Sequence, residues 1–74
     1  MILTDHAKRR RKQMGVTEDE IERVLAAPEV TYPSQGRMCL VGGRLCVVTE
    51  ADQERVVTVL WAGREGREDE GEQT

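Results

Sequence analysis

Three side chains in this sequence have the chemistry to cleave RNA without a metal ion. His6 and Arg10 are four residues apart in a segment with helical spacing, so they share one side of a helix. Cleavage through the 2′-hydroxyl needs a base, an acid for the leaving oxygen and cations on the phosphate. Imidazole titrates nearest neutral pH, so His6 suits the first two roles, and Arg10 with Arg37 suits the third. The structural alternative is that His6 helps to begin the helix and packs against the sheet, while Arg10 pairs with a carboxylate.

An uninterrupted basic run in the same segment suggests contact with nucleic-acid phosphates. Besides Arg10, its members are Lys8, Arg9, Arg11 and Lys12. The charges are distributed around a helix, so at most three or four face one direction. The alternative is a solvated helix surface. It is supported by the equal numbers of basic and acidic side chains in residues 1–63 and by the scarcity of aromatic residues for base stacking.

The middle of the chain contains two apolar segments around Gly42-Gly43. This dipeptide is typical of a two-residue hairpin turn, because glycine readily adopts positive φ. It predicts strands at residues 37–41 and 44–50, with Cys39 opposite Cys46 in the wider kind of cross-strand pair, so no disulfide is expected. The middle of this hairpin is apolar on both of its faces.

Two short helices can cover only one face of such a sheet. The second face is then expected to meet a second copy of the chain, another protein or the chain's own end. The candidates for this interface are the outward apolar side chains of the strands and the single tryptophan, namely Cys39, Val41, Cys46, Val48 and Trp61. We therefore expect a protein partner or a homodimer, with RNA as a possible further partner.

Local signals specify the elements that position these side chains. Thr4 as N-cap and Gly15 as a left-handed terminator predict a helix over residues 5–14. Thr17 and Glu20 form a capping box for a second helix, in which each side chain bonds the other residue's backbone amide. Pro28 then stops that helix.

A short strand at residues 30–32 and a last strand at residues 55–61 complete the predicted sheet. The fold expected for residues 1–62 is a single α+β domain, in which an N-terminal helical hairpin packs on a three- or four-stranded antiparallel sheet. Residues 64–74 carry five acidic and two basic side chains and account for the whole formal net charge of −3. Without apolar side chains to bury, residues 63–74 are expected to form a disordered acidic tail.

Composition narrows the class of protein further. No apolar run approaches the roughly 20 residues that span a bilayer, and the N-terminus lacks the apolar region of a signal peptide. Two cysteines are too few for a disulfide framework or a zinc site. We expect a cytoplasmic protein that binds no membrane, metal or cofactor.

The helical hairpin resembles that of a family of small bacterial and phage proteins that forms a domain of unknown function. Its pattern is roughly H-A-x-x-R-x-x-x-R-G-I-S, followed by an acidic helix and a proline. Here the pattern reads His6-Ala7-Lys8-Arg9-Arg10, then Met14-Gly15-Val16-Thr17 and Pro28, with Met14 in place of an arginine. That family is similar in layout to the BrnT and RelE-like toxins, whose α–α–β sheets cleave RNA and are neutralised by antitoxins. The resemblance implies a shortened form of that fold in a bacterial or phage protein.

Three functions follow as hypotheses. The first is a small toxin-like interaction module that binds a protein partner or itself through the uncovered sheet face. The second is a metal-independent endoribonuclease that uses His6, Arg10 and Arg37, and the third is a nucleic-acid binder without catalysis. No set of residues amounts to a catalytic signature, so the sequence leaves open whether the protein is an enzyme.

Overall fold

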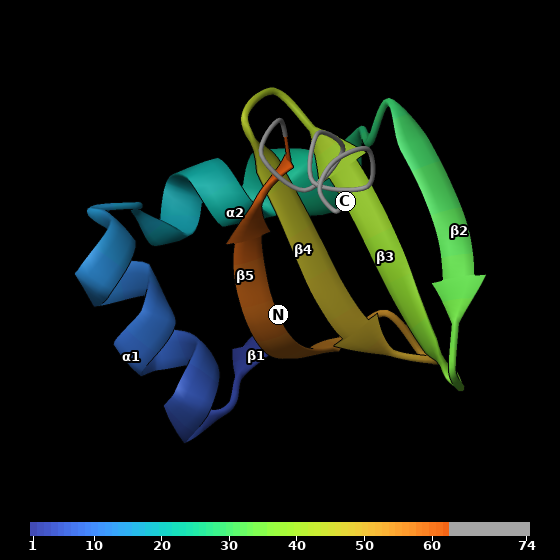
Figure 1. Ribbon diagram of the computed structural model, residues 1–74, viewed down its shortest axis with the longest axis horizontal. Coiled ribbons are helices and arrows are strands. Elements are labelled where there is room, and N and C mark those ends of the chain that lie inside the picture. Colours follow the sequence, from blue (N-terminus) through green and yellow to red (C-terminus); the bar gives the residue numbers. More distant parts are fainter. Residues whose placement is uncertain (63–74) are drawn as a thin grey trace, which may run out of the picture.

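The computed structural model describes residues 1–62, which form two helices and a five-stranded sheet. The strand order across the sheet is β1 (Ile2–Leu3), β5 (Arg55–Trp61), β4 (Leu45–Glu50), β3 (Arg37–Gly42) and β2 (Val30–Ser34). Figure 1 shows helix α2 (Glu18–Ala26) behind the sheet and helix α1 (Asp5–Met14) beside β5. The predicted α+β architecture is confirmed. The predicted acidic tail, residues 63–74, lies outside the described residues.

Helix α1 begins and ends at the predicted residues. The Thr4 hydroxyl accepts a hydrogen bond from the Ala7 amide at 3.1 Å and donates one to the Val57 carbonyl of β5, also at 3.1 Å. At the other end, Gly15 has φ 73° and its amide bonds the Lys12 carbonyl at 3.2 Å. One hydroxyl thus both begins the helix and fastens it to the sheet.

Helix α2 confirms one half of the predicted capping box. The Thr17 hydroxyl accepts from the Glu20 amide at 3.2 Å. The Glu20 carboxylate does not complete the box, because both of its oxygens bind Arg44 in the β3–β4 turn. The helix ends at Ala26, two residues before Pro28.

The turn between β3 and β4 lies one residue later than predicted. Gly42 pairs with Leu45, so the two turn residues are Gly43 and Arg44. Of these two, only Gly43 has a positive φ, 56°, which is the pattern of a type II′ turn. Gly42 instead belongs to the strand, and a Cβ added there would lie 3.5 Å from the Val24 side chain. Helix α2 therefore packs closely against the end of β3.

This correction changes the cross-strand pairs but not the faces. Cys39 pairs with Val48, and Cys46 pairs with Val41, whereas the predicted register paired the two cysteines with each other. The pairing moved by two positions, and side chains alternate with a period of two, so each side chain keeps its expected face. Within the described residues, Cys39 and Cys46 form no disulfide.

Three features of the sheet differ from the prediction. β1 pairs in parallel with β5, which makes the sheet mixed and adds a strand. β2 continues two residues past its predicted end at Tyr32, through Pro33 to Ser34, so the proline lies in an edge strand. A β-bulge interrupts the pairing of β4 with β5, and it allows Val56 and Val59 both to face the core although they are three residues apart.

The core lies between the helices and one face of the sheet. It is aliphatic, and Met14, Leu25 and Trp61 are among the partly buried side chains that pack against it. Its buried members are Ala7, Val16, Ile21, Val24, Leu40, Leu45, Val47, Val56 and Val59.

Candidate functional site

The sheet face away from the helices is the candidate site, and we call it the open face. Neither helix of the described residues covers it (Figure 1). The strand register places two rows of side chains across four strands of this face. One row is Val30, Val41, Cys46 and Leu60, and the other is Tyr32, Cys39, Val48 and Thr58.

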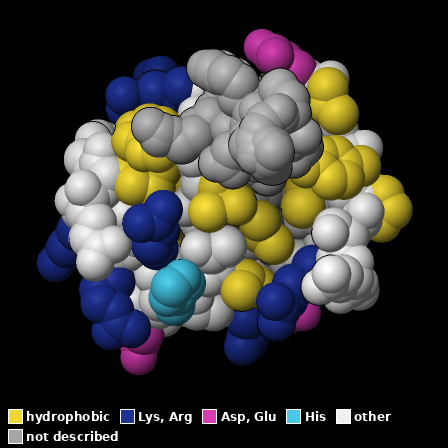
Figure 2. All heavy atoms as spheres, in the orientation of Figure 1, with side chains coloured by type: hydrophobic (Ala, Val, Ile, Leu, Met, Phe, Trp, Pro, Cys, Tyr) yellow, Lys and Arg dark blue, Asp and Glu magenta, His cyan; other side chains and the backbone are white. Residues whose placement is uncertain are grey.

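Burial within the open face falls from its centre to its outer strand. Cys39 and Cys46 are buried, with 7% and 1% of their surface exposed. Val41, Val48 and Leu60 around them are half-buried, while on β2 Val30 is 53% and Tyr32 is 39% exposed. Figure 2 looks onto this face and shows hydrophobic side chains on the part of it that is in view. This arrangement is an apolar surface rather than a second closed core.

Sequence reasoning identified four of these residues and missed the others. Cys39, Val41, Cys46 and Val48 lie on the open face as expected. Val30, Tyr32, Thr58 and Leu60 were missed, although the alternation of β2 and β5 carried a signal for the apolar three. Trp61 was assigned to the interface, but it pairs with the core residue Leu45 and packs against the core. Its ring lies 5.1 Å below the guanidinium carbon of Arg44, on the helix side of the sheet.

The histidine lies at the border of the open face. His6 Nε2 lies 3.1 Å from the hydroxyl oxygen of Thr58, which shares a row with Val48. Arg10 follows one turn later on the same side of α1, and its guanidinium donates to the Gln13 side chain at 3.4 Å. Figure 2 shows the histidine, in cyan, between basic and hydrophobic side chains. α1 thus places an imidazole and a cation beside the apolar surface.

The third residue of the proposed catalytic set lies elsewhere. Arg37 begins β3, where it pairs with Ser34 on one side and Glu50 on the other. Strand β4 lies between Arg37 on β3 and Thr58 on β5, and Arg37 is also two residues further along the strand direction. Ordinary strand spacings then put the two backbones about 12 Å apart. The structure therefore brings together His6 and Arg10 but not Arg37.

The side chains of the basic run differ in exposure in the folded chain. Lys8, Arg9 and Lys12 are exposed on α1. Arg11 is half-buried and donates from Nη1 to the Val16 carbonyl at 3.0 Å, so it helps to close the end of the helix. Three of the four cations predicted for phosphate contact thus remain at the surface.

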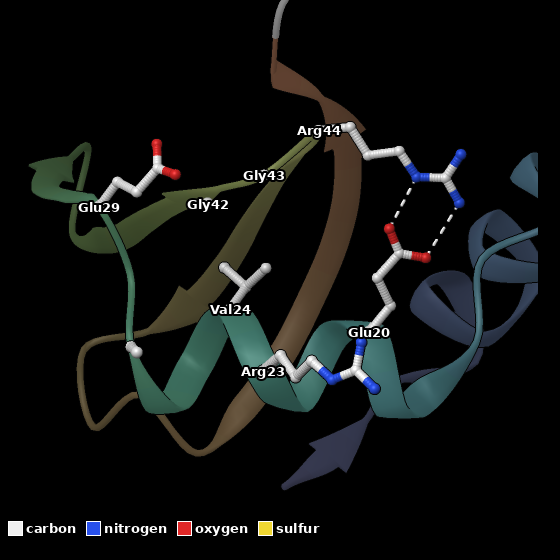
Figure 3. A pocket seen from close by; sticks show the side chains of 8 residues that line it. Glu20, Arg23, Val24, Glu29, Gly42, Gly43 and Arg44 are labelled. Carbon is white, nitrogen blue, oxygen red and sulfur yellow. Dashed lines mark hydrogen bonds and ion pairs between the residues drawn. The ribbon is translucent and has the colours of Figure 1, made fainter.

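A depression of about 290 Å³ lies on the helix side, between α2 and the β3–β4 turn. In Figure 3, Glu29 lies across from the ion pair of Glu20 with Arg44, and Val24 points toward the space between them. The Arg44 hydrogen bonds hold the pKa of Glu20 below its usual value against the opposing effect of burial. Two carboxylates and two guanidiniums line this depression, so its charges balance and favour no charged ligand.

The described residues contain neither a metal-binding cluster nor a membrane-spanning helix. Within residues 1–62, no three His, Cys, Asp or Glu side chains are grouped so that they could hold a metal ion. No helix in this part of the chain has both the length and the apolar character to cross a membrane. Comparison with family models, with curated proteins and with solved structures found no match to this chain.

Proposed function

We propose that this protein is a small interaction module that binds another protein molecule through the open face. The observation that carries the proposal is the apolar surface that continues across four strands and reaches an exposed valine, Val30, at the edge. Apolar patches of this kind on small proteins are commonly binding sites, because contact with a partner removes them from water. The toxin-like character expected from the resemblance remains part of this proposal.

The ribonuclease hypothesis has less support from the geometry. Its imidazole and Arg10 border a surface made of apolar side chains, and Arg37 lies on β3 with one strand between. The cations beside His6 are then Arg9 and Arg10 of the same helix, without the strand cation Arg37 that the hypothesis assigned to the phosphate. The exposed cations Lys8, Arg9 and Lys12 could bind RNA phosphates without catalysis. Such binding would weaken strongly as the salt concentration rises.

Two neighbouring residues of β2 provide a matched test of the proposal. Val30 and Thr31 are both exposed, but they point to opposite faces of the same edge strand. Val30→Glu places a charge on the open face, and Thr31→Glu places the same charge on the other face. Neither position is in the core, so both variants are expected to fold.

The measurement combines sedimentation velocity with affinity capture from a cell lysate, using the full chain and both variants as bait. We expect an associated species, either a second copy or another protein, that the native chain and Thr31→Glu retain and Val30→Glu loses. Circular dichroism verifies that the baits are folded. Identical behaviour of the two variants in both measurements would refute a role for the open face.

A further inference from the structure

We infer that the open face receives an amphipathic helix with acidic flanks, presented by a different protein. The inference rests on the proposed function and names the class of partner. Three features support this inference: the positive charge along one border of the open face, the small apolar area of that face, and the proline in the edge strand β2.

The border formed by α1 is cationic. Since His6 contacts Thr58 on the open face, the residues three and four positions later, Arg9 and Arg10, follow on the same side of α1. At the far end of the open face, Arg37 is directly opposite Glu50, so that end carries both signs. The border along β5 therefore attracts acidic groups on a partner.

The apolar area is small for a dimer. Four strands about 4.8 Å apart and two rows of side chains give a patch of roughly 300 Å². Stable interfaces bury about 800 Å² on each partner, so two copies meeting only through this patch would associate weakly. Within residues 1–62, a second copy also brings the same cationic border on α1. A helix of three or four turns is about 16 to 22 Å long and fits the patch, which is about 19 Å across its strands.

Residues 63–74 of the sequence are polar, charged or glycine. They contain no apolar side chain that could be buried on the open face. An RNA strand would be equally unsuited to the centre of the face, where valine, leucine and cysteine side chains supply neither cations nor stacking rings.

Addition of a strand to the β2 edge is disfavoured by Pro33. Gln35 and Gly36 form a two-residue turn, so Ser34 and Arg37 are the first hydrogen-bonded pair of the hairpin. Hydrogen-bonded and non-hydrogen-bonded pairs alternate along the hairpin, so Pro33 and Met38 form a non-hydrogen-bonded pair. The backbone groups of Pro33 therefore point away from β3, toward the free edge, where proline has no amide hydrogen to donate to an added strand. A partner that lies across the face is therefore favoured over one that extends the sheet.

The test uses the isotope-labelled full chain and two designed helical peptides of about 16 residues. Both carry leucine along one side, and the flanks are glutamate in one peptide and lysine in the other. The probe is the change in amide resonances, which detects weak binding. We expect the acidic peptide to shift Val41, Val48 and Leu60 and to bind about tenfold more tightly than the lysine peptide at low salt.

Charge reversal on α1 supplies the control. The double variant Arg9→Glu with Arg10→Glu changes the border of the open face, and Lys8→Glu with Lys12→Glu makes the same change of charge on the opposite side of the helix. We expect the first variant to prefer the lysine peptide and the second to retain the native preference.

The possible failures are distinguishable. Equal affinity for the two peptides would overturn the acidic helix while leaving the open face as a protein-binding surface. Resonance shifts at the open face that depend on protein concentration alone, without a response to peptide, would identify a second copy instead. A single-stranded oligonucleotide that shifts these resonances when the peptides do not would replace the partner with nucleic acid. If the open-face resonances respond to none of these, the proposed function fails as well.

Discussion

Arg44 donates two hydrogen bonds to the carboxylate of Glu20 and so connects the β3–β4 turn to α2. Its Nε donates to Oε2 at 2.7 Å and its Nη2 donates to Oε1 at 2.9 Å. A planar guanidinium matches a carboxylate in this two-bond geometry better than a lysine does. Trp61 on the last strand lies against the same guanidinium, so three distant segments meet at one side chain.

The ion pair predicts a pH-dependent contribution to stability. Arg44 lowers the pKa of Glu20 in the folded protein below its usual value of 4.5. A carboxyl whose pKa is lowered by folding stabilises the protein above its unfolded pKa, and this contribution is lost as the pH falls through the folded pKa. Glu20→Gln should therefore lower the melting temperature at pH 7 by about 1 to 5 °C, a small effect because the pair is exposed.

Thermal unfolding of the native chain and Glu20→Gln, followed by circular dichroism from neutral to acidic pH, tests this expectation. The two melting temperatures should approach each other as the pH falls below 4.5 and should coincide once the pH is below the lowered pKa of Glu20 in the folded protein. Glu22→Gln, an exposed change of the same kind on the same helix, is the control. If the difference in melting temperature between the native chain and Glu20→Gln is the same in acid as at neutral pH, the ion pair is not its cause.

The two adjacent glycines of the β3–β4 hairpin are predicted to respond differently to alanine. Gly43 has φ 56°, where a Cβ is strained, so Gly43→Ala should reduce the free energy of unfolding by about 1 kcal/mol. A Cβ on Gly42 would make only ordinary contacts with Val24 at 3.5 and 3.6 Å, so Gly42→Ala should change that free energy by less than about 0.5 kcal/mol. Urea unfolding measures both. Equal losses would favour the turn at Gly42-Gly43.

The Thr4 hydroxyl is predicted to contribute more than an ordinary helix cap. Thr4→Ala removes both the bond from Ala7 and the bond to Val57, and should cost about 1 to 2 kcal/mol. Thr4→Ser keeps the hydroxyl and should retain most of the stability. Thr17→Ala removes a cap with the single bond to Glu20 and serves as the reference, with a loss of about 1 kcal/mol. Similar losses in Thr4→Ala and Thr17→Ala would show that the bond to β5 contributes little.

Two leucines test which face of the sheet is the core. Leu45 is fully buried beneath the helices, and Leu45→Ala should cost about 3 kcal/mol through lost burial and a cavity. Leu60 is half-buried on the open face, so Leu60→Ala should cost about 1 kcal/mol. Denaturant unfolding with a common slope gives both values. A larger loss for Leu60→Ala would mean that the helices do not cover the face described here.

The amino-acid sequence by itself determined the elements whose signals are local. Thr4 and Gly15 set the bounds of α1, because a cap needs only residues within one turn. The face of each residue in β3 and β4 also followed from sequence, since alternation survives a shift of the register by two. For the open face, this identified its two cysteines and their valine partners.

The tertiary structure decided the features that depend on distant contacts. Close packing of α2 on Gly42 accompanies the move of the hairpin turn to Gly43, and Arg44 takes the carboxylate that the capping box would have used. The parallel pairing of β1 and the bulge in the pairing of β5 with β4 have no local signature, yet the bulge sets which side chains of β5 face the core. The pairing of β1 with β5 joins residues 53 positions apart, and the whole core determines it. The face on which Trp61 lies and the contact of His6 with the open face are therefore decided only in the folded chain.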